Sequence, residues 1–533
     1  MKRMLCLLVA LVMMLSAASA VAEVKYTCME DHQTYPISKE KITLRLWYPM
    51  AGSMGELANF NDSEFFQWME ELTNIHIEFE IPTTNTEKDA FQLLFASDEM
   101  PDLIYSEPGK YQYRGGEDKA IEDGYFINLA DYMQYAPNYQ EWLETYPAFK
   151  KASYSDSGKM YGLWGVWFPM YDIVQADQGL AVRKDFLDKV GLDVPVTYDD
   201  WYVMLKAFKD QLGIEAPYYT SKYGIDVKGE MMAGFDTAPY FYQKDGAVKY
   251  GPLDDSYKEY LTMLNKWWNE GLLDRDFATR TSTGITADNE MMLNDKVGSL
   301  TDYGTRLSDT YITRGATNPE FYLVGVQQPV KKVGDVPAYR DYMSGNDMLD
   351  GYCMNINAAS KNIEAAIRWT DAFYAASIYL NANFGIESQE NVVWHKAEDG
   401  HRIGNYDFRY KNPNGISSAT VLVKYWAKNP NVRVESAQIE QSDENKQNGY
   451  KTWSQFVPTN WLSIRNTFTS EEGTEYASMY TDIETYVQEC NVKFIMGQMS
   501  LDDYDSYRDT LRKMGIERCI ELKQSALDRY NAR

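Results

Sequence analysis

The sequence predicts an α/β fold that is organised as more than one lobe. Between residues 41 and 105, segments that alternate like strands take turns with segments that have the 3.6-residue period of helices. The short links between them favour a mainly parallel sheet covered by helices. The chain has 533 residues, which is too long for one hydrophobic core to grow comfortably, so two lobes are expected.

The first elements can be placed in chain order. A strand is expected over Lys41–Pro49, and Ser63 is expected to cap a helix with apolar residues at helical spacing. Residues 75–82 alternate as a second strand, and a helix then leads to Pro101 and a buried strand at 102–105. Open parallel sheets bind ligands beyond the carboxyl ends of their strands. Those ends are here at 48–50 and 106–108.

The stretch from Arg183 to Trp201, RKDFLDKVGLDVPVTYDDW, holds five aspartates around an apolar skeleton. A short strand at 180–183 is expected to lead into a helix at 185–190 that Gly191 ends. Thr197 is expected to cap the next helix, with two aspartates in its first turn, where they complement the helix dipole. The aspartates are therefore predicted to have capping and solvent roles, and a catalytic acid cluster is unnecessary.

The N-terminus has the pattern of a secretory signal. Two basic residues precede an apolar run that is too short to span a bilayer, and small residues follow. Cleavage is expected after Ala22, which leaves residues 23–40 as an N-terminal extension. A lipid anchor needs a cysteine directly after the small residues; Cys6 lies too early and Cys28 too late. We therefore expect export to the cell surface, the periplasm or the medium without a lipid.

Charge and cysteine content exclude some classes of function. The net charge of −26 disfavours nucleic acid and anionic membranes as partners, because both require a basic surface. The spacing of the cysteines fits no zinc ribbon. Most of the four that follow the signal are expected to be small buried residues, and Cys490 with Cys519 is the least implausible disulfide pair.

The 183–201 stretch resembles the extracellular solute-binding proteins of ABC importers. Within them it is most similar to the large sugar-binding group that handles oligosaccharides and uronate-containing fragments. Other segments agree in order and spacing, and the resemblance covers roughly residues 41 to 533: FINLADYM (126–133), SGKMYGLW (157–164), DGAVKYGPLDDSYKEYLTMLNKWWNEGLLD (245–274) and the C-terminal run that begins KFIMGQMSLDDY.

This resemblance implies a two-lobed clamp of the periplasmic-binding-protein type, each lobe a mostly parallel sheet flanked by helices, with a hinge between them. Lobe one is expected to hold residues 41–167 and 318–388, and lobe two residues 168–317 and 389–533. The helix at 362–375 would close lobe one. Some relatives carry a calcium loop where this chain reads DQLGIEAP. That segment lacks the necessary oxygens, so no calcium is expected there, and no other metal or cofactor is implied.

A sugar site needs aromatic rings against the apolar faces of the sugar and polar groups for its hydroxyls. The chain has 42 Tyr and 13 Trp, most of which must serve packing. The candidate aromatic residues are Trp47, Tyr48, Trp164, Trp167, Tyr303, Trp394 and Trp461. The candidate polar residues are Glu107, Asp236, Asp302 and Asp347.

These observations lead to the expectation of a monomeric binding protein, not an enzyme, that captures a carbohydrate and delivers it to an ABC permease. A peptide or another polar solute is the alternative ligand. The alternative class is a secreted carbohydrate-active enzyme, which would place two carboxylates in such a cleft. The sequence selects no such pair of carboxylates. It also lacks a zinc H-E-x-x-H motif, a G-x-S-x-G elbow and a P-loop.

Overall fold

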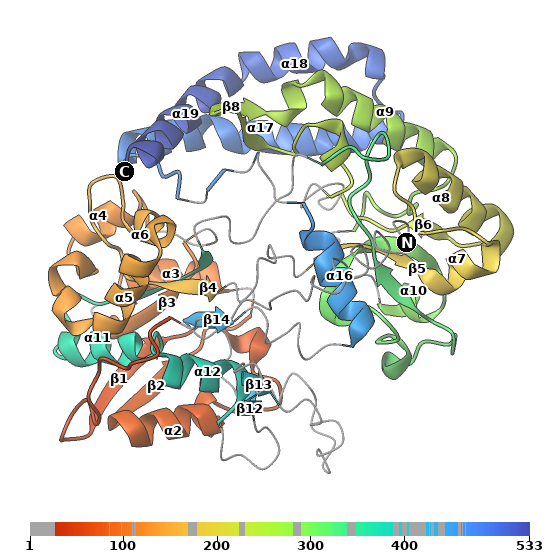
Figure 1. Cartoon of the computed structure of the whole chain (residues 1–533). Helices are drawn as coiled ribbons and strands as arrows, with labels where there is room; N and C mark the ends of the chain where they lie inside the picture. Colours follow the sequence, from red (N-terminus) through yellow and green to blue (C-terminus); the bar gives the residue numbers. More distant parts are fainter. Residues whose placement is uncertain are drawn as a thin grey trace, which may run out of the picture.

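Two α/β lobes and a group of C-terminal helices form the protein, as Figure 1 shows for the computed structural model. The structure describes residues 27–84, 86–97, 99–108, 110, 113–168, 178–222, 230–280, 289–337, 348–386, 394–396, 402–404, 423–425, 427, 431–434, 443–456, 460, 462–463 and 465–533. The signal segment lies outside these residues. Within them, no helix is both long and apolar enough to cross a membrane.

Lobe one is built on a six-stranded sheet in the order β14-β4-β11-β3-β1-β2. Parallel pairs join β1 to β2 and β3, and β14 to β4, whereas β11 is antiparallel to both β3 and β4. Five strands therefore end at the same edge, with β11 as the one reversed strand. Their bounds are β1 Ile42–Trp47, β2 Ile75–Glu80, β3 Leu103–Ser106, β4 Leu163–Phe168, β11 Leu349–Ile356 and β14 Val432–Val434.

The predicted alternation in β1 is confirmed, because Leu44 and Leu46 are almost fully buried. Ser63 immediately precedes helix α2, as expected, but its hydroxyl donates to the carbonyl oxygen of Lys424 and does not cap the helix.

The helices of this lobe are α2 Glu64–Thr73, α3 Glu87–Leu94, α4 Glu117–Glu122, α5 Pro137–Thr145, α6 Pro147–Ser153, α11 Ile363–Ala372 and α12 Ala376–Phe384. A hairpin of β12 Trp394–Lys396 and β13 Arg402–Gly404 lies beside α12.

Lobe two contains a four-stranded sheet in the order β10-β5-β9-β6. Here β5 is the reversed strand, since it is antiparallel to β10 and β9 while β6 is parallel to β9. The sheet strands are β5 Gln178–Arg183, β6 Ala216–Tyr218, β9 Val297–Tyr303 and β10 Leu323–Gly325, and a hairpin comprises β7 Phe241–Lys244 and β8 Ala247–Tyr250. The helices before the C-terminal group are α7 Lys184–Val190, α8 Tyr198–Leu212, α9 Asp255–Asn269, α10 Asn289–Leu293 and α16 Glu444–Ser454.

The 183–201 stretch folds largely as predicted. Helix α7 ends at Gly191, whose φ of 69° is left-handed, and Thr197 forms a reciprocal capping box with Asp200 at the start of α8. The expected role was wrong for Asp185. Its carboxylate is 8% exposed and accepts two hydrogen bonds from the buried Arg183 guanidinium, at 2.8 and 2.7 Å. Arg183 also bonds to Asp295, which is distant in the sequence. A local sequence pattern could not reveal this buried charge cluster.

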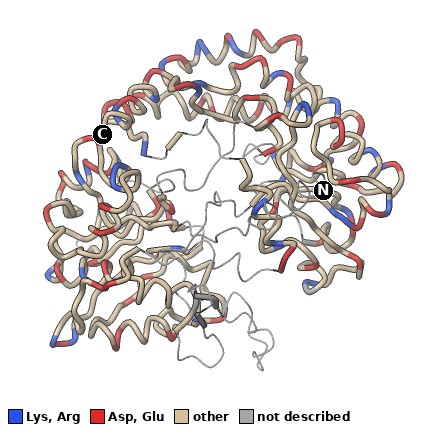
Figure 2. The backbone as a smooth tube through the Cα atoms, in the orientation of Figure 1, with Lys and Arg blue, Asp and Glu red and all other residues tan. Residues whose placement is uncertain are grey.

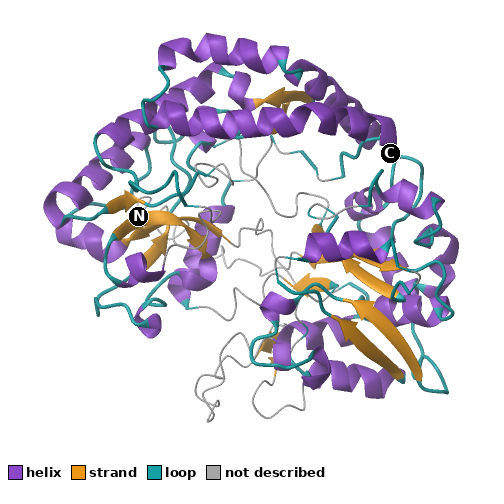
Figure 3. Ribbon diagram, turned by 180° about the vertical axis from the view of Figure 1, so that it is seen from behind, coloured by secondary structure: helices purple, strands orange, loops and turns teal. Residues whose placement is uncertain are grey.

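The C-terminal helices extend from lobe two to lobe one. Helix α17 (Ser470–Ile495) packs against α9 and α19 (Ile516–Ala532), and α18 (Tyr504–Lys513) packs against α19. Figure 3 shows these helices along one side of the molecule, with the C-terminus beside lobe one. Arg529 and Arg533 fasten that end, because both donate to the carboxylate of Asp156 at 2.8 Å.

Two predicted lobe boundaries need correction. Residues 323–325 form β10 of the second sheet, although residues from 318 were expected in lobe one. Residues 432–434 form β14 of the first sheet, although residues from 389 were expected in lobe two. Both strands are three residues long, and their places depend on pairing with distant strands, which the local pattern does not reveal.

Acidic and basic side chains are distributed over the whole described part of the protein. Figure 2 shows Asp and Glu over both lobes and the C-terminal helices, with Lys and Arg interspersed.

Cys28, Cys353, Cys490 and Cys519 are all buried and free. Their expected packing role is confirmed, and Cys490 and Cys519 form no disulfide.

Candidate ligand-binding site between the lobes

The ends of the strands identify the surfaces that the lobes present to each other. The chain leaves lobe one after β4 at Phe168 and begins β5 in lobe two at Gln178. It returns to lobe one at the amino end of β11 and leaves again after β14. β11 and β5 are the reversed strands. The carboxyl ends of the other strands in each sheet therefore lie on the side where the chain passes from one lobe to the other. This is the edge where open α/β sheets bind ligands.

Three tyrosines cluster at this edge of lobe one. The rings of Tyr105 and Tyr352 are stacked, with centroids 5.0 Å apart and an interplanar angle of 2°. Tyr48, at the end of β1, lies 5.3 Å from Tyr105. Tyr352 is half-buried, so it is the member of the cluster with a surface that a ligand can reach. An aromatic face of this kind suits the apolar side of a sugar ring.

A buried carboxylate lies against the tyrosine cluster. Asp350 is 6% exposed, and its Oδ1 accepts a hydrogen bond from the Tyr352 backbone amide at 3.0 Å. Its Oδ2 has no hydrogen-bond partner among the described residues. Gly165 makes room for it, since a Cβ there would lie 2.2 Å from Oδ1. Burial raises the pKa of Asp350 to about 6, against the opposing effect of Arg433.

A basic and an acidic side chain border the same edge. The Arg433 guanidinium lies 4.2 Å from the ring centroid of Trp167, which is 5% exposed. Glu107 is half-buried at the end of β3 and pairs with Lys110 at 3.7 Å. Burial raises the pKa of Glu107, and Lys110 only partly offsets this effect. Glu107 in turn contributes to the raised pKa of Asp350, whose main cause is burial.

A pocket of about 1030 Å³ lies at the junction of lobe one and the C-terminal segment. Its lobe-one side includes residues 113–119, Ser155–Ser157 and Trp164, and its other side includes residues 465–469, the first turn of α17 and Lys523 of α19. Pockets that take small ligands are commonly of this size and often lie where domains meet.

Several buried polar atoms of residues that line this pocket have no hydrogen-bond partner among the described residues. Asn466 is 6% exposed, and among the described residues neither atom of its side-chain amide has a hydrogen-bond partner. The same holds for Oδ1 of Asp118 and Nε1 of Trp164. Buried polar atoms are normally paired, because an unpaired one costs roughly 1–3 kcal/mol. A ligand rich in hydroxyl groups can supply both the donors and the acceptors that these atoms need.

Two cations have different roles in the pocket. Arg465 is 2% exposed, donates to the Glu117 carboxylate at 2.5 and 2.8 Å, and lies 4.3 Å from the Trp164 ring. It therefore holds the C-terminal segment to lobe one. Lys523 lies over the rings of Phe468 and Tyr476, at 4.8 and 5.2 Å. Burial lowers its pKa to about 8, so near neutral pH its amine can serve as a hydrogen-bond donor to a ligand.

Lobe two contributes the end of β9. Tyr303 is half-buried, and the Arg306 guanidinium lies 5.1 Å from its ring centroid. Asp302 is fully buried and accepts hydrogen bonds from Arg306 at 3.0 Å and from the Tyr311 hydroxyl at 2.7 Å. Asp302 therefore holds the residues around Tyr303 in place, whereas Tyr303 itself has a surface that a ligand can reach.

The structure brings some of the predicted residues to this site and places others elsewhere. Tyr48, Glu107 and Trp167 lie at the lobe-one edge, Trp164 at the pocket, and Asp302 with Tyr303 at the lobe-two edge. Trp164 lines the pocket, but its ring is fully buried against Arg465 and offers no exposed face to a ligand. Trp47 is 3% exposed and packs against Phe91.

The other predicted residues are away from the site or outside the described part. Asp236 is exposed and pairs with Lys244 of the β7–β8 hairpin. Asp347 and Trp461 lie outside the described residues, and so does the side chain of Trp394, whose backbone begins β12. Their roles as ligand contacts stay predictions.

Sequence reasoning missed six residues of the site: Tyr105, Asp350, Tyr352, Arg433, Asn466 and Lys523. The strand pattern at 102–105 could have identified Tyr105, because the predicted binding edge begins there. No local signal identifies Asp350 or Arg433, since strand pairing alone brings β11 and β14 beside β4.

The fold is that of solute-binding proteins. AlgQ2, an alginate-binding protein crystallised without calcium ion, superposes with a TM-score of 0.71 at 18% identity over 93% of this chain and 100% of that chain. FusA of Streptococcus pneumoniae in complex with kestose superposes with a TM-score of 0.67 at 18% identity over 92% of this chain and 99% of that chain. The predicted two-lobed α/β class is therefore confirmed.

Curated relatives point in the same direction, although no family model matches the chain. Lipoprotein LipO of Bacillus subtilis is 27% identical over 53% of this chain and 54% of LipO. The fructooligosaccharide ABC transporter substrate-binding protein FusA of Streptococcus pneumoniae serotype 4 is 23% identical over 94% of this chain and 92% of FusA. The chain thus spans about half the length of LipO and most of FusA. The predicted resemblance to the solute-binding proteins of ABC importers is confirmed.

Proposed function

We propose that the protein is the substrate-binding component of an ABC importer and that it captures an oligosaccharide outside the membrane. The observation that carries this proposal is the combination of a half-buried aromatic stack at the binding edge of lobe one with a pocket, at the junction with the C-terminal segment, whose buried polar atoms have no partner among the described residues. A sugar offers apolar ring faces and many hydroxyls, which match both features. The likeness to FusA over nearly the whole of both chains supports the same class of ligand.

The rest of the proposal concerns location and partners. The chain is exported with its signal removed near Ala22 and passes its ligand to permease subunits as a monomer. The N-terminal pattern supports export, and the likeness to FusA, which is named an ABC transporter substrate-binding protein, supports delivery to a transporter. LipO is named a lipoprotein, whereas the first cysteine after the expected cleavage position, Cys28, lies too far from it to carry a lipid.

A calorimetric titration of the mature protein with a panel of glycans and peptides tests the proposal. We expect at least one oligosaccharide to bind with one ligand per chain and to be recovered intact afterwards. Binding of peptides alone would move the protein to the alternative ligand class.

A second function, that of a carbohydrate-active enzyme, is open to the same test, because Glu107 and Asp350 lie at one edge. Burial raises the pKa of both carboxyls, whereas a glycosidase pair keeps one carboxyl protonated and the other ionised. If the bound glycan is cleaved, and the cleavage is lost in Glu107→Gln, the protein is a carbohydrate-active enzyme. Recovery of intact glycan after long incubation contradicts this second function.

Trp461→Ala is expected to weaken oligosaccharide binding by about 1–4 kcal/mol, the range for a buried aromatic anchor. This corresponds to roughly a ten- to thousand-fold loss of affinity. The residue shortly precedes the pocket-lining segment that begins at Arg465. Trp268→Ala is the matched control, since Trp268 packs on Phe277 at the end of α9, away from the site. If calorimetry gives equal affinities for Trp461→Ala and the wild type, Trp461 does not contact the ligand.

A further inference from the structure

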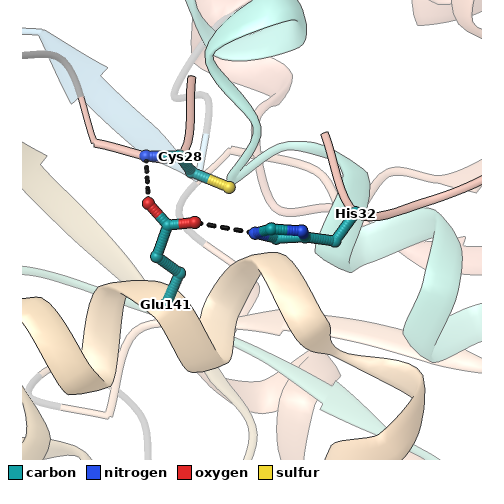
Figure 4. Close-up of side chains that lie close together, drawn as sticks. All are labelled: Cys28, His32 and Glu141. Atoms are coloured by element: carbon teal, nitrogen blue, oxygen red, sulfur yellow. Dashed lines mark hydrogen bonds and ion pairs between the residues drawn. The ribbon is translucent and has the colours of Figure 1, made fainter. Parts of the chain in front are cut away.

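A cysteine, a histidine and a glutamate meet on lobe one, away from the residues of the ligand site. Residues 27–40 run along this lobe before β1, and they bring Cys28 and His32 against Glu141 of α5. One ligand atom from each of the three side chains lies within 4.8 Å of the others. Figure 4 shows the Cys28 sulfur and the His32 ring on the side of the Glu141 carboxylate that faces away from α5.

Backbone contacts hold the three side chains in this arrangement. The Cys28 amide donates to Glu141 Oε1 at 2.8 Å, and Cys28 has a left-handed φ of 56°. The His32 amide donates to Asn138 Oδ1 at 2.8 Å, and the His32 ring bonds through Nε2 to Glu141 Oε2 at 2.7 Å. The Cys28 thiol donates only weakly, to Asn138 Oδ1 at 3.3 Å and to the Glu30 carbonyl oxygen at 3.5 Å, and a bound ion would replace these two contacts.

The surroundings of the cluster are strongly acidic. Glu141, Asp371 and Asp31 all act on Cys28 and, together with its burial, raise the pKa of the thiol. Among the described residues of this region, the cation Arg368 donates to the side chain of Gln33 and to carbonyl oxygens of residues 34 and 37. A site of this charge is electrostatically favourable for a divalent cation.

We propose that Cys28, His32 and Glu141 bind a divalent cation of the zinc class, with water in the fourth position. Thiolate, imidazole and carboxylate are the ligand types that zinc takes, at about 2.3, 2.0 and 2.1 Å. A tetrahedral ion with these bonds separates its ligand atoms by roughly 3.3–3.7 Å. The His32 Nε2 and Glu141 Oε2 atoms, now 2.7 Å apart, must therefore separate by about half an ångström to admit the ion. The Cys28 sulfur lies within 4.8 Å of the other ligand atoms, so it has to approach them by about an ångström at most. The side chains of His32 and Glu141 are 37% and 36% exposed, so they can rotate and admit the ion.

Zinc displaces the proton of the Cys28 thiol, while the Nε2 proton of His32 leaves or moves to Nδ1. Binding therefore releases at least one proton and weakens as pH falls. Since the ion joins the N-terminal segment to α5, it also stabilises lobe one by binding the folded state alone.

Calorimetry with ZnCl2 on the mature, untagged protein after chelator treatment tests this proposal. We expect one zinc per chain, a rise in melting temperature, and proton release seen as a dependence of the heat on the buffer. Cobalt(II) should give a thiolate-to-metal charge-transfer band. Calcium should leave the melting temperature unchanged, because a sulfur and nitrogen ligand set disfavours a hard cation.

Variants separate this site from other zinc ligands in the chain. His32→Gln and Glu141→Gln should each weaken zinc binding roughly ten-fold or more, and Cys28→Ser should abolish the charge-transfer band. His76→Gln is the control, since His76 also bonds to a glutamate, Glu70, at 2.7 Å on lobe one but belongs to no three-residue cluster of this kind among the described residues. Equal zinc affinity of His32→Gln, Glu141→Gln and the wild type, or no binding by the wild type, would overturn the proposal.

Discussion

Arg465→Ala is expected to lower the free energy of unfolding by about 3–5 kcal/mol, the usual result of breaking a buried ion pair. The variant leaves Glu117 buried, at 7% exposure, without its cation. It also removes the hydrogen bond to the Ala152 carbonyl oxygen and the contact with the Trp164 ring. Urea denaturation followed by circular dichroism measures the change.

Two comparisons test the stated cause of this loss. Arg465→Met combined with Glu117→Leu removes both charges and should recover most of the stability, because no charge is left unpaired. Arg518→Ala breaks an exposed ion pair with Glu475 and should leave the urea midpoint almost unchanged, because water screens such a pair. If Arg465→Ala is as mild as Arg518→Ala, the ion pair does not join the C-terminal segment firmly to lobe one.

Asp350→Asn is expected to stabilise the protein by about 3 kcal/mol at pH 7.5. Burial moves the pKa of this carboxyl from an ordinary value of 3.8 to about 6, and each pKa unit corresponds to about 1.4 kcal/mol. The folded state keeps the proton up to about pH 6, whereas the unfolded state loses it near pH 4. The wild type therefore loses stability as pH rises between these values, and the variant avoids this loss.

The pH dependence separates this cause from a general effect of asparagine. Below about pH 4 the variant and the wild type should unfold at similar urea concentrations, and their difference should grow up to about pH 6. The same substitution should weaken oligosaccharide binding by about 1.5–3 kcal/mol, the range for a hydrogen bond to a charged group. A difference in stability that is independent of pH would show that Asp350 is not a buried ionisable group.

The local elements of the fold could be predicted because their signals are local. The alternation of β1, the Gly191 end of α7 and the Thr197 cap of α8 each depend on a few neighbouring residues. Strand order depends on contacts between distant segments. For this reason β10 and β14, each three residues long, were assigned to the wrong lobes, and the reversed direction of β11 was not expected.

The site could be predicted less completely than the fold. The rule that ligands bind at the carboxyl ends of strands selects the edge that carries Tyr48 and Glu107. It could not distinguish Trp47, whose ring turns into the core, from Tyr48, which joins the cluster at the edge. Asp350 and Asn466 could not be identified from the sequence. What distinguishes them is burial without a full set of hydrogen-bond partners among the described residues, which is a property of the packed structure and not of the residue type.

The most direct test of capture between the lobes is X-ray scattering of the wild type with and without its oligosaccharide. A ligand that contacts both lobes favours the closed state by its differential affinity for that state. We therefore predict that the radius of gyration falls when the ligand identified by calorimetry saturates the protein. An unchanged radius of gyration at saturation would contradict closure of the two lobes around the ligand.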